Sequence, residues 1–589
     1  MAQSIMQEHL YGDLLAPTLG YHTDFAMGMT YSLGFDTLLT AHLAFGMLGD
    51  MDEKATQAPH LLLEAILKNS DKMVIFCNKG GIAVPPTIRK VYSLLEKNIF
   101  EVFDSKNKTA NFHPKMWLIR EVNNDNRKDV QIKLIVSSRN MVYSDAIDCI
   151  VALTGKVSSN TTENPKHKRL RTFIEKVVSY SNISEDKAKQ VKALARDIEH
   201  IGRFDVSSPF EDYDFYPYLF QEDFDLGKVQ DYLCGTESII ISPFIDKTLI
   251  GRINPNRKDH RALITRKEYV TTEIFNSFDS KGGVFIALDD LASRGMDLHA
   301  KMYLVWMGRD KHYLYLGSAN ATNSAFERNG EFLLRLKFEY GNSKFYHLLN
   351  DFYEENNKDS KFVRLNEPIE KATTVIRWDK AELAMKELMC SDDLTAKITK
   401  HRDGSFSILV TSSLKKLENA VSIAPLQKRD MLKEWKGRAL FDGLAADELS
   451  EFYIISAQSE EGTLHEAIIR IYTEGMPNER DAAIYKSIIK NRPDFVKFLE
   501  LMLSDTPIQY LSNEIILKEK GLGSSADDRH EFPQVYEKML QVAAVNPGQL
   551  LQIEKTLKKF DTETVPKEFS QIFKQFTTPV RDNRVSYTI

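Results

Sequence analysis

The sequence predicts an α/β protein with two similar lobes, each a mixed sheet flanked by helices, followed by an α-rich C-terminal region. Two observations support this fold class. Short apolar runs bounded by turn residues alternate with helical patterns over roughly residues 20–375. A set of polar residues late in this stretch also recurs, in the same order, early in it. Duplication at the length of a whole domain indicates two lobes and not a solenoid of short repeats.

The first lobe is expected over residues 1–163. Its expected helices are His60–Lys68 and Thr87–Lys97. Its expected strands are Met73–Cys77, Ile99–Phe103, Met116–Arg120, Val130–Val136 and Cys149–Leu153. Strands that alternate with helices in this way are typical of a layered α/β domain.

A charged helical linker is expected over residues 164–204, before the second lobe at residues 205–375. The second lobe repeats the order of elements in the first. Its expected strands are Glu237–Ser242, Ala262–Thr265, Val284–Ala287, Met302–Trp306, His312–Leu316 and Glu331–Leu336. Its expected helices are Thr272–Phe278 and Ser343–Tyr353.

Residues 376–589 are expected to be mostly helical. A strand pair is predicted at Lys397–Thr399 and Ser405–Val410. The predicted helices are Leu464–Tyr472, Asp481–Leu503 and Val535–Lys559. This region carries no metal, nucleotide or nucleophile motif, so it predicts a fold class and no function.

Composition excludes some classes of protein. A formal charge of −6 argues against a basic coat for nucleic acid, although a local basic groove remains compatible with it. The four cysteines lack metal-ligand spacing, which indicates free thiols in a reducing compartment and no metal. The N-terminus lacks the pattern of a signal peptide, and Tyr31–Leu48 is too polar to span a bilayer. We therefore expect a cytoplasmic protein that has no membrane association and no cofactor.

The recurring polar set is the strongest functional signal. In the second lobe it comprises His299, Lys301, Ser318, Asn320 and Glu331. The histidine and the lysine are two residues apart, so they leave the same face of a strand. A buried sheet face that carries such groups is costly unless they serve one another or a ligand.

The first lobe contains a second copy of this set. Its members are His113, Lys115, Ser138, Asn140 and Asp148, with the aspartate in place of the glutamate. Other histidines, namely His22, His42, His60, His260 and His312, have no such context and are interpreted as structural.

Two such sets facing each other suit attack on a phosphodiester. One neutral imidazole can act as a nucleophile, and the other can protonate the leaving alkoxide and then deprotonate water. Lysines and asparagines can neutralise the non-bridging oxygens. Asp148 and Glu331 suit the role of orienting the imidazoles. Fixed cations of this kind make a divalent metal unnecessary.

The pattern HxK followed by [GS]SxN, twice in one chain, resembles the phospholipase D superfamily, which also contains nucleases and tyrosyl-DNA phosphodiesterases. The resemblance implies phospholipase D-like lobes with one active site between them. It also implies metal-independent chemistry through a covalent histidine intermediate, with His113 as nucleophile and His299 as acid.

One departure from the family pattern bears on the substrate. The superfamily has an aspartate five positions after the lysine, where this chain has Arg120 and Trp306. Tyrosyl-DNA phosphodiesterases and some nucleases share this loss, which disfavours a lipid hydrolase. The run Ser138-Arg139-Asn140 followed by Asp148 further resembles phospholipase D-like proteins of prokaryotic defence systems.

A basic cluster in the second lobe is the candidate nucleic-acid-binding surface. Its members are Arg252, Arg257, Lys258, Arg261, Arg266 and Lys267. The favoured function is a nuclease acting on DNA or RNA, with a role in antiviral defence and a helicase or second subunit docked on the C-terminal region.

Two other functions remain open. A phospholipid phosphodiesterase or transferase would need a membrane-binding surface, and the sequence has neither an amphipathic basic helix nor a lipidation signal. A partner-binding scaffold with vestigial lobes is the third hypothesis, against which the complete polar sets argue.

Overall fold

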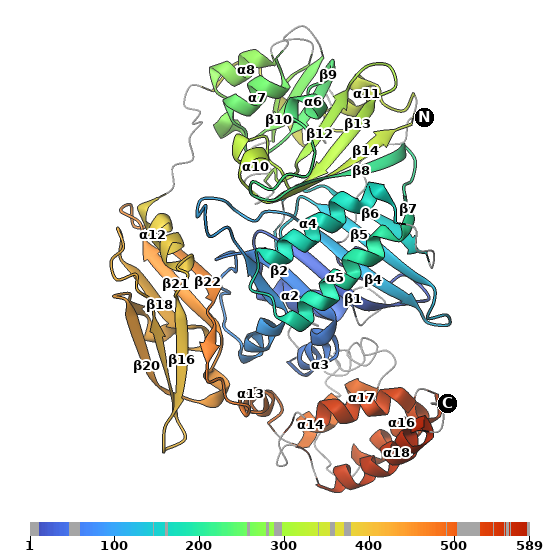
Figure 1. The fold of residues 1–589 in the computed structure, drawn as a ribbon, viewed down its shortest axis with the longest axis vertical. Helices are drawn as coiled ribbons and strands as arrows, with labels where there is room; N and C mark the ends of the chain where they lie inside the picture. Colours follow the sequence, from blue (N-terminus) through green and yellow to red (C-terminus); the bar gives the residue numbers. More distant parts are fainter. Residues whose placement is uncertain are drawn as a thin grey trace.

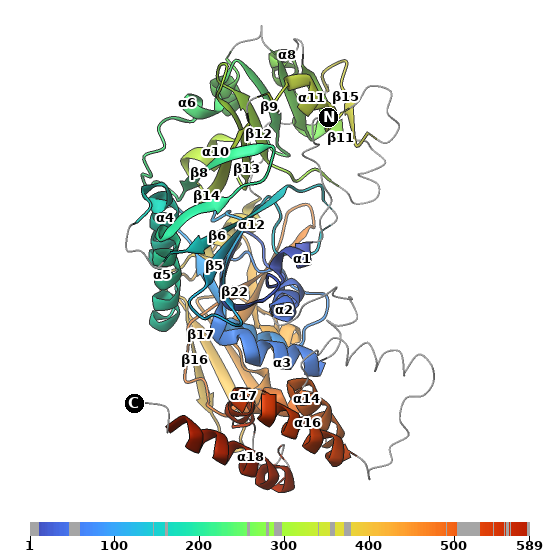
Figure 2. The ribbon, with the colours of Figure 1, turned by 90° about the vertical axis from the view of Figure 1, so that its right-hand side faces the viewer.

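The computed structural model describes most of the chain. The described residues are 11–45, 59–144, 146–158, 163–255, 260–278, 282–287, 297–339, 341–353, 360–369, 379–490, 492–503, 531–545, 547–558, 560, 565 and 567–585. Figures 1 and 2 show two α/β lobes stacked along the longest axis, with the C-terminal region beside and below the first lobe.

The first lobe is built on a seven-stranded sheet of order β3-β2-β1-β4-β5-β6-β7. Its strands are β1 (Tyr21–Thr30), β2 (Met73–Asn78), β3 (Ile99–Val102), β4 (Met116–Asn123), β5 (Val130–Ser137), β6 (Ile150–Val157) and β7 (Ile201–Asp205). β1, β2 and β3 run parallel, whereas β4 to β6 add antiparallel neighbours on the other side of β1.

The second lobe repeats this arrangement in a sheet of order β15-β11-β10-β9-β12-β13-β14-β8. Its strands are β8 (Phe210–Tyr218), β9 (Glu237–Ile241), β10 (Arg261–Thr265), β11 (Gly283–Ala287), β12 (Met302–Trp306), β13 (His312–Gly317), β14 (Glu331–Phe338) and β15 (Phe362–Arg364). Apart from the added β15, each strand matches one of the first sheet in position and direction. The predicted duplication is therefore confirmed at the level of strand order.

Helices cover the outer faces of both sheets and fill the space between them. The outer helices are α2 (Phe35–Ala44) and α3 (Pro59–Asn69) in the first lobe, and α6 (Val229–Leu233), α7 (Lys247–Ile253), α8 (Thr272–Ser277) and α10 (Asn323–Glu327) in the second. The shared core between the sheets contains side chains of α4 (Lys168–Ser179), α5 (Glu185–Glu199) and α11 (Phe345–Asn350). Because one apolar core spans both inner faces, the lobes are packed together and not merely tethered.

The prediction of a mostly helical C-terminal region is wrong for the first part of that region, which is β-rich. After α12 (Lys380–Met389), two four-stranded sheets enclose one apolar core. Their strands are β16 (Thr395–Lys400), β17 (Phe406–Thr411), β18 (Val421–Pro425), β19 (Lys433–Glu434), β20 (Arg438–Leu444), β21 (Phe452–Gln458), β22 (Leu464–Arg470) and β23 (Thr473–Glu474).

The segment Leu464–Tyr472 shows why the prediction failed. Its apolar spacing fits a helix, but Ile468 packs into the core of the first lobe, whereas Ile469 packs between the two C-terminal sheets. Successive side chains of a strand point to opposite faces of the sheet, as these two do. A strand buried on both faces has no alternating pattern that would distinguish it from a helix.

The expected helices near the end of the chain are confirmed, although two of them are divided. The elements are α13 (Arg480–Ile488), α14 (Arg492–Leu503), α16 (Glu531–Val545), α17 (Pro547–Leu557) and α18 (Lys567–Val585). Several of their apolar side chains join α2 and α3 in one core.

Two smaller differences from the sequence-based expectations occur in the lobes. The expected helix Thr87–Lys97 is a 3-10 helix over Lys90–Lys97. The linker contains two helices, α4 and α5.

Candidate active site

The two polar sets meet where the lobes are joined by backbone hydrogen bonds. Phe112 forms a parallel bridge with Gly330, and Ile147 forms one with Leu298. The amide of His113 donates to the carbonyl of Gly330 over 2.8 Å, and the amide of His299 donates to that of Ile147 over 2.9 Å. Each histidine thus enters the site on a segment that is fastened to the opposite lobe.

The carboxylates cross between the lobes in the same way. His113 Nδ1 lies 2.9 Å from Glu331 Oε2, and His299 Nδ1 lies 2.7 Å from Asp148 Oδ1. The sequence suggested that these carboxylates orient the imidazoles, but chain order alone does not say that each histidine takes its partner from the other lobe. Neither lobe contains a complete histidine–carboxylate pair.

A buried serine holds each carboxylate in place. Ser138 Oγ donates to Asp148 Oδ1 over 2.6 Å, and Ser318 Oγ donates to Glu331 Oε2. Each serine oxygen also accepts the amide of the residue after the carboxylate, Cys149 or Phe332, over 2.9 Å. The recurring serine is therefore a positioning residue whose contacts are the same in both lobes.

The two lysines are buried behind the histidines. Lys115 is 1% exposed, and its Nζ lies 2.9 Å from His113 Nε2. Lys301 is fully buried and donates to the carbonyl of His299 over 2.6 Å. Burial lowers the pKa of both lysines, and repulsion by Lys301 lowers that of Lys115 further. The pKa of Lys301 falls to about 8.

Both imidazoles are neutral at pH 7. Burial is the main cause of the lowered pKa in each case, and nearby lysine charges add to it. The pKa of His299 falls to about 4 despite its hydrogen bond with Asp148, and that of His113 falls well below its usual value. Because Lys115 can only donate, His113 Nε2 accepts its hydrogen bond, and Nδ1 carries the proton.

The two carboxylates differ in charge. Burial raises the pKa of Glu331 to about 8, although Lys115 and the Ser318 hydroxyl oppose the rise. Burial is also the largest single effect on Asp148 and acts in the same direction, but the hydrogen bond and charge of His299, the Ser138 hydroxyl and the charge of Lys301 together outweigh it and bring the pKa below the usual value. Burial therefore favours the protonated form of Glu331, whereas the neighbours of Asp148 favour its ionised form.

The asparagines and the carboxylates leave polar atoms free at the site. Asn140 Oδ1 accepts the amide of Ser32 over 3.4 Å. Three buried oxygens have no hydrogen-bond partner among the described residues, namely Asp148 Oδ2, Asn320 Oδ1 and Glu331 Oε1. Orphaned buried polar atoms are uncommon in folded proteins, and this concentration marks a place for a polar ligand.

Tyr31 is a site residue that the sequence did not reveal. Its ring centroid lies 5.0 Å from that of His113, and Lys115 Nζ lies 6.0 Å from the same ring. It directly follows β1, and its counterpart in the second lobe is Pro243, after β9. No duplicated motif therefore includes it.

The basic cluster predicted in the second lobe does not form a single surface. The prediction that Arg261 belongs to a binding surface is wrong. This residue is 1% exposed and donates hydrogen bonds to the Gly235 carbonyl and to Ser238 Oγ, so it is a core residue. Arg252 is paired with Glu327. Arg257 and Lys258 lie outside the described residues.

Of the remaining two members of that cluster, Arg266 lies near the site. Arg266 pairs with Asp297 and donates to the Leu298 carbonyl over 3.3 Å, directly before His299. Lys267 is exposed.

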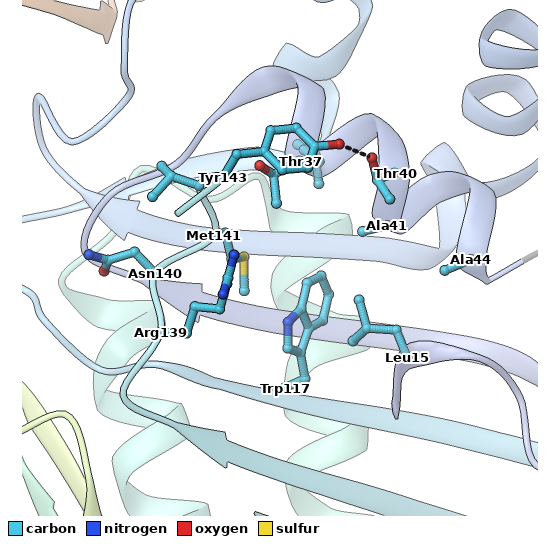
Figure 3. Close-up of a pocket in the computed structure, with 12 residues that line it drawn as sticks. Leu15, Thr37, Thr40, Ala41, Ala44, Trp117, Arg139, Asn140, Met141 and Tyr143 are labelled. Carbon is cyan, nitrogen blue, oxygen red and sulfur yellow. Dashed lines mark hydrogen bonds between the residues drawn. The ribbon is translucent and has the colours of Figure 1, made fainter. Parts of the chain in front are cut away.

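A pocket of about 140 Å³ lies beside the first lobe's serine–asparagine motif (Figure 3). Its walls include Leu15, Trp117 and Met141, together with Arg139 and Asn140 at the edge nearest the motif. Neither the catalytic histidines nor the lysines line it. The pocket therefore adjoins the reaction site and shares Asn140 with it.

Two solved structures of yeast tyrosyl-DNA phosphodiesterase mutants are similar to this chain. The first has a TM-score of 0.34 and 10% sequence identity, and the match covers 56% of this chain and 85% of that one. The second has a TM-score of 0.32 and 11% identity, with coverage of 57% and 85%. Neither a protein-family model nor a curated protein matches the chain.

Within the described ranges, no three His, Cys, Asp or Glu side chains gather as metal ligands would. No helix in the same ranges has the length and apolar character needed to cross a bilayer.

Proposed function

We propose that this protein is a metal-independent phosphodiesterase that cleaves nucleic acid through a covalent phosphohistidine. The observation that carries the proposal is the crossed pairing of His113 with Glu331 and of His299 with Asp148, with both lysines buried beside the imidazoles. Two oriented neutral imidazoles around buried cations suit a two-step displacement at phosphorus.

In the first step His113 Nε2 attacks phosphorus, a P–N bond forms, and the bond to the leaving oxygen breaks. In the resting site the lone pair of this nitrogen accepts a hydrogen bond from Lys115 Nζ. Bound substrate therefore has to draw the ammonium onto a phosphoryl oxygen before attack. His299 gives its Nε2 proton to the leaving oxygen. A bound phosphodiester anion favours the protonated state of His299, because a nearby negative charge raises the pKa of an imidazole.

In the second step His299, now neutral, accepts a proton from water as the water oxygen attacks phosphorus. The P–N bond breaks, and His113 Nε2 regains its lone pair. Asp148 stabilises the imidazolium of His299 in both steps because it is ionised and hydrogen-bonded to Nδ1.

The lysines supply the positive charge that the reaction needs. Lys115 and Lys301 each lower the pKa of His113, which places both ammonium groups within electrostatic range of the nucleophile. The asparagines Asn140 and Asn320 add amide donors. Preorganised donors in a buried site stabilise developing charge strongly because they need no reorganisation during the reaction.

DNA or RNA is the proposed substrate, and a role in prokaryotic antiviral defence is part of the proposal. The defence role rests on the Ser138-Arg139-Asn140…Asp148 motif. A helicase or a second subunit is the proposed partner of the C-terminal region. The alternatives are a phospholipid phosphodiesterase or transferase and a scaffold with vestigial lobes.

The test is incubation with DNA, RNA and phosphatidylcholine vesicles in excess EDTA. Cleavage of nucleic acid that is abolished in His113→Ala and in His299→Ala supports the proposal. The matched control is Lys192→Gln, an exposed change on α5. Hydrolysis of phosphatidylcholine without cleavage of nucleic acid would instead support the phospholipid phosphodiesterase. Activity that disappears with EDTA would overturn the metal-independent mechanism.

A further inference from the structure

A second group of cations lies beside the segment that leads to His113, and it is separate from the catalytic lysines. Its centre is Asn111, two residues before the histidine. Lys386 Nζ donates to Asn111 Oδ1 over 2.9 Å. The Asn111 backbone is held by the second lobe, since its carbonyl accepts the amide of Gly330 over 2.8 Å. The first lobe, the second lobe and the C-terminal region therefore meet at this residue.

Arg328 is the unusual member of this group. Its two terminal nitrogens contact hydroxyls, Thr109 Oγ1 at 3.5 Å and Ser324 Oγ at 2.9 Å. Its Nε is buried and has no hydrogen-bond partner among the described residues. In the same ranges, no carboxylate forms an ion pair with this guanidinium. A half-buried cation that keeps an unpaired donor is costly in an isolated protein and suits an anionic ligand.

Lys386 and Arg328 are close enough to repel each other. Burial lowers the pKa of Lys386 to about 8, and the charge of Arg328 adds to this effect. Two further cations, Lys79 and Lys108, act together with Lys386 on the thiol of Cys390, so they lie in the same neighbourhood. Lys79 is ion-paired with the buried Glu101, and Glu382 partly offsets the charge of Lys386, so the local positive potential comes mainly from Arg328, Lys386 and Lys108.

Helix α12, which carries Lys386, is firmly seated against the first lobe. A Cβ atom on Gly80 would lie 2.3 Å from Met389 Sδ, so the helix packs directly on the loop after β2. His465 pairs with Asp379 and Glu382 at the start of the helix. The amide of Ile468 also donates to the carbonyl of Ile82 over 2.9 Å. The position of Lys386 is therefore fixed by packing and not by a flexible loop.

We propose that Arg328 and Lys386 bind a second phosphate of the substrate, next to the one that reacts, so that α12 is part of a nucleic-acid-binding site. This rests on the proposed phosphodiesterase function and specifies its substrate as a chain of phosphodiesters. Two residues of extended backbone span at most about 7 Å, so the cluster begins within about one nucleotide of the reaction centre. A phosphatidylcholine has one phosphodiester and a cationic headgroup, which these two cations would repel.

The experiment compares a single-stranded oligonucleotide with bis(p-nitrophenyl) phosphate, which has one phosphodiester and no second phosphate. The variants are Arg328→Gln, Lys386→Gln and the double substitution. For each single variant we expect the ratio of kcat/KM for the oligonucleotide to kcat/KM for the small substrate to fall about tenfold or more, which matches the loss of about 1.4 kcal/mol of charge-assisted binding. The effect is expected mainly in the KM of the oligonucleotide.

Salt dependence distinguishes a phosphate contact from a structural role. The slope of log(kcat/KM) for the oligonucleotide against log[salt] should become shallower by about 0.7 for each lost contact to a single strand. Arg196→Gln and Lys192→Gln, two exposed charge-removing changes on α5, should leave both the ratio and the slope as in the wild type.

Each outcome has a defined meaning. Equal losses on both substrates, with an unchanged salt slope, would assign Arg328 and Lys386 a structural role and overturn the inference. An unchanged ratio in folded variants, checked by thermal unfolding, would overturn it as well. In both cases wild-type cleavage of the oligonucleotide would leave the proposed function standing. If the wild type hydrolyses only the small substrate and no nucleic acid, the proposed substrate falls, and this inference falls with it.

Discussion

The two halves of the active site share a scaffold but differ in their electrostatics. In both halves a histidine follows a segment bonded to the other lobe, a serine holds the carboxylate, and a lysine lies behind the imidazole. The pKa of Glu331 is raised to about 8, however, whereas that of Asp148 is lowered below its usual value. A duplicated fold can therefore assign different roles to equivalent residues through the balance between burial and the hydrogen bonds and charges around each group.

The surroundings of the two histidines differ as well. His113 lies against the ring of Tyr31, and the segment before it contacts α12 of the C-terminal region. The amide of Phe112, directly before His113, donates to Asn78 Oδ1. The carbonyl of Leu298, directly before His299, accepts a hydrogen bond from Arg266. The half-site of His113 is enclosed by protein, and that of His299 is bordered by a cation.

The largest expected effect separates the two histidines directly. Oligonucleotides labelled at either end are mixed with His299→Ala and quenched in detergent at alkaline pH, where a phosphoramidate survives. We expect a labelled covalent adduct on this variant, because loss of the general acid–base leaves the second step slow. His113→Ala should give none. An adduct on His113→Ala and none on His299→Ala would reverse the assigned roles.

The next effect compares the carboxylates. Asp148→Asn should lower kcat by about 100-fold or more, because an ionised partner stabilises the imidazolium of His299. Glu331→Gln should cost about tenfold or less, since a neutral amide resembles the protonated carboxyl that it replaces. Single-turnover kinetics measure both values. Equal losses would show that the two carboxylates have the same charge in the working enzyme.

The pH profile tests the lysine of the second half. Lys301 is charged below its pKa of about 8 and loses its charge above it, so kcat/KM should fall as the pH rises through about 8. The neutral form of His113, whose pKa is lowered, should keep the acid limb below about pH 6.5. Lys301→Arg should move the alkaline limb to higher pH because a guanidinium stays charged. An unmoved limb in that variant would assign the titration to another group.

The smallest expected effect concerns stability. Ser138→Ala and Ser318→Ala each leave a carboxyl oxygen and a backbone amide without a partner, and each should lower the free energy of unfolding by about 1–3 kcal/mol. The loss should be larger for Ser318→Ala because Glu331 is more deeply buried than Asp148. Denaturant unfolding measures both, with the exposed Ser179→Ala as control. A larger loss for Ser138→Ala would contradict this order.

The sequence contained the duplicated sets and the strands that carry them, because each set lies within about 40 residues and follows the strict two-residue period of a strand. The sequence could not predict that each histidine pairs with a carboxyl group of the other lobe, because this pairing depends on how the two lobes dock. The contact of Lys386 with Asn111 joins residues 275 positions apart and has no local signal. The predictions of a surface position for Arg261 and of a helix around Ile468 failed for a related reason. Both residues are buried by segments distant in sequence, and the residues next to them in the chain do not indicate this burial.

The backbone bridges between the lobes also determine when activity can appear during synthesis. His113 acquires its orienting carboxyl group from Glu331 of the second lobe, and the segment before it is bonded to Gly330 of that lobe as well as to Asn78 of the first. On the proposed mechanism, a nascent chain that has released the whole first lobe from the ribosome therefore still lacks an oriented nucleophile. The cell that makes this protein is exposed to its chemistry only after both lobes have been translated and docked.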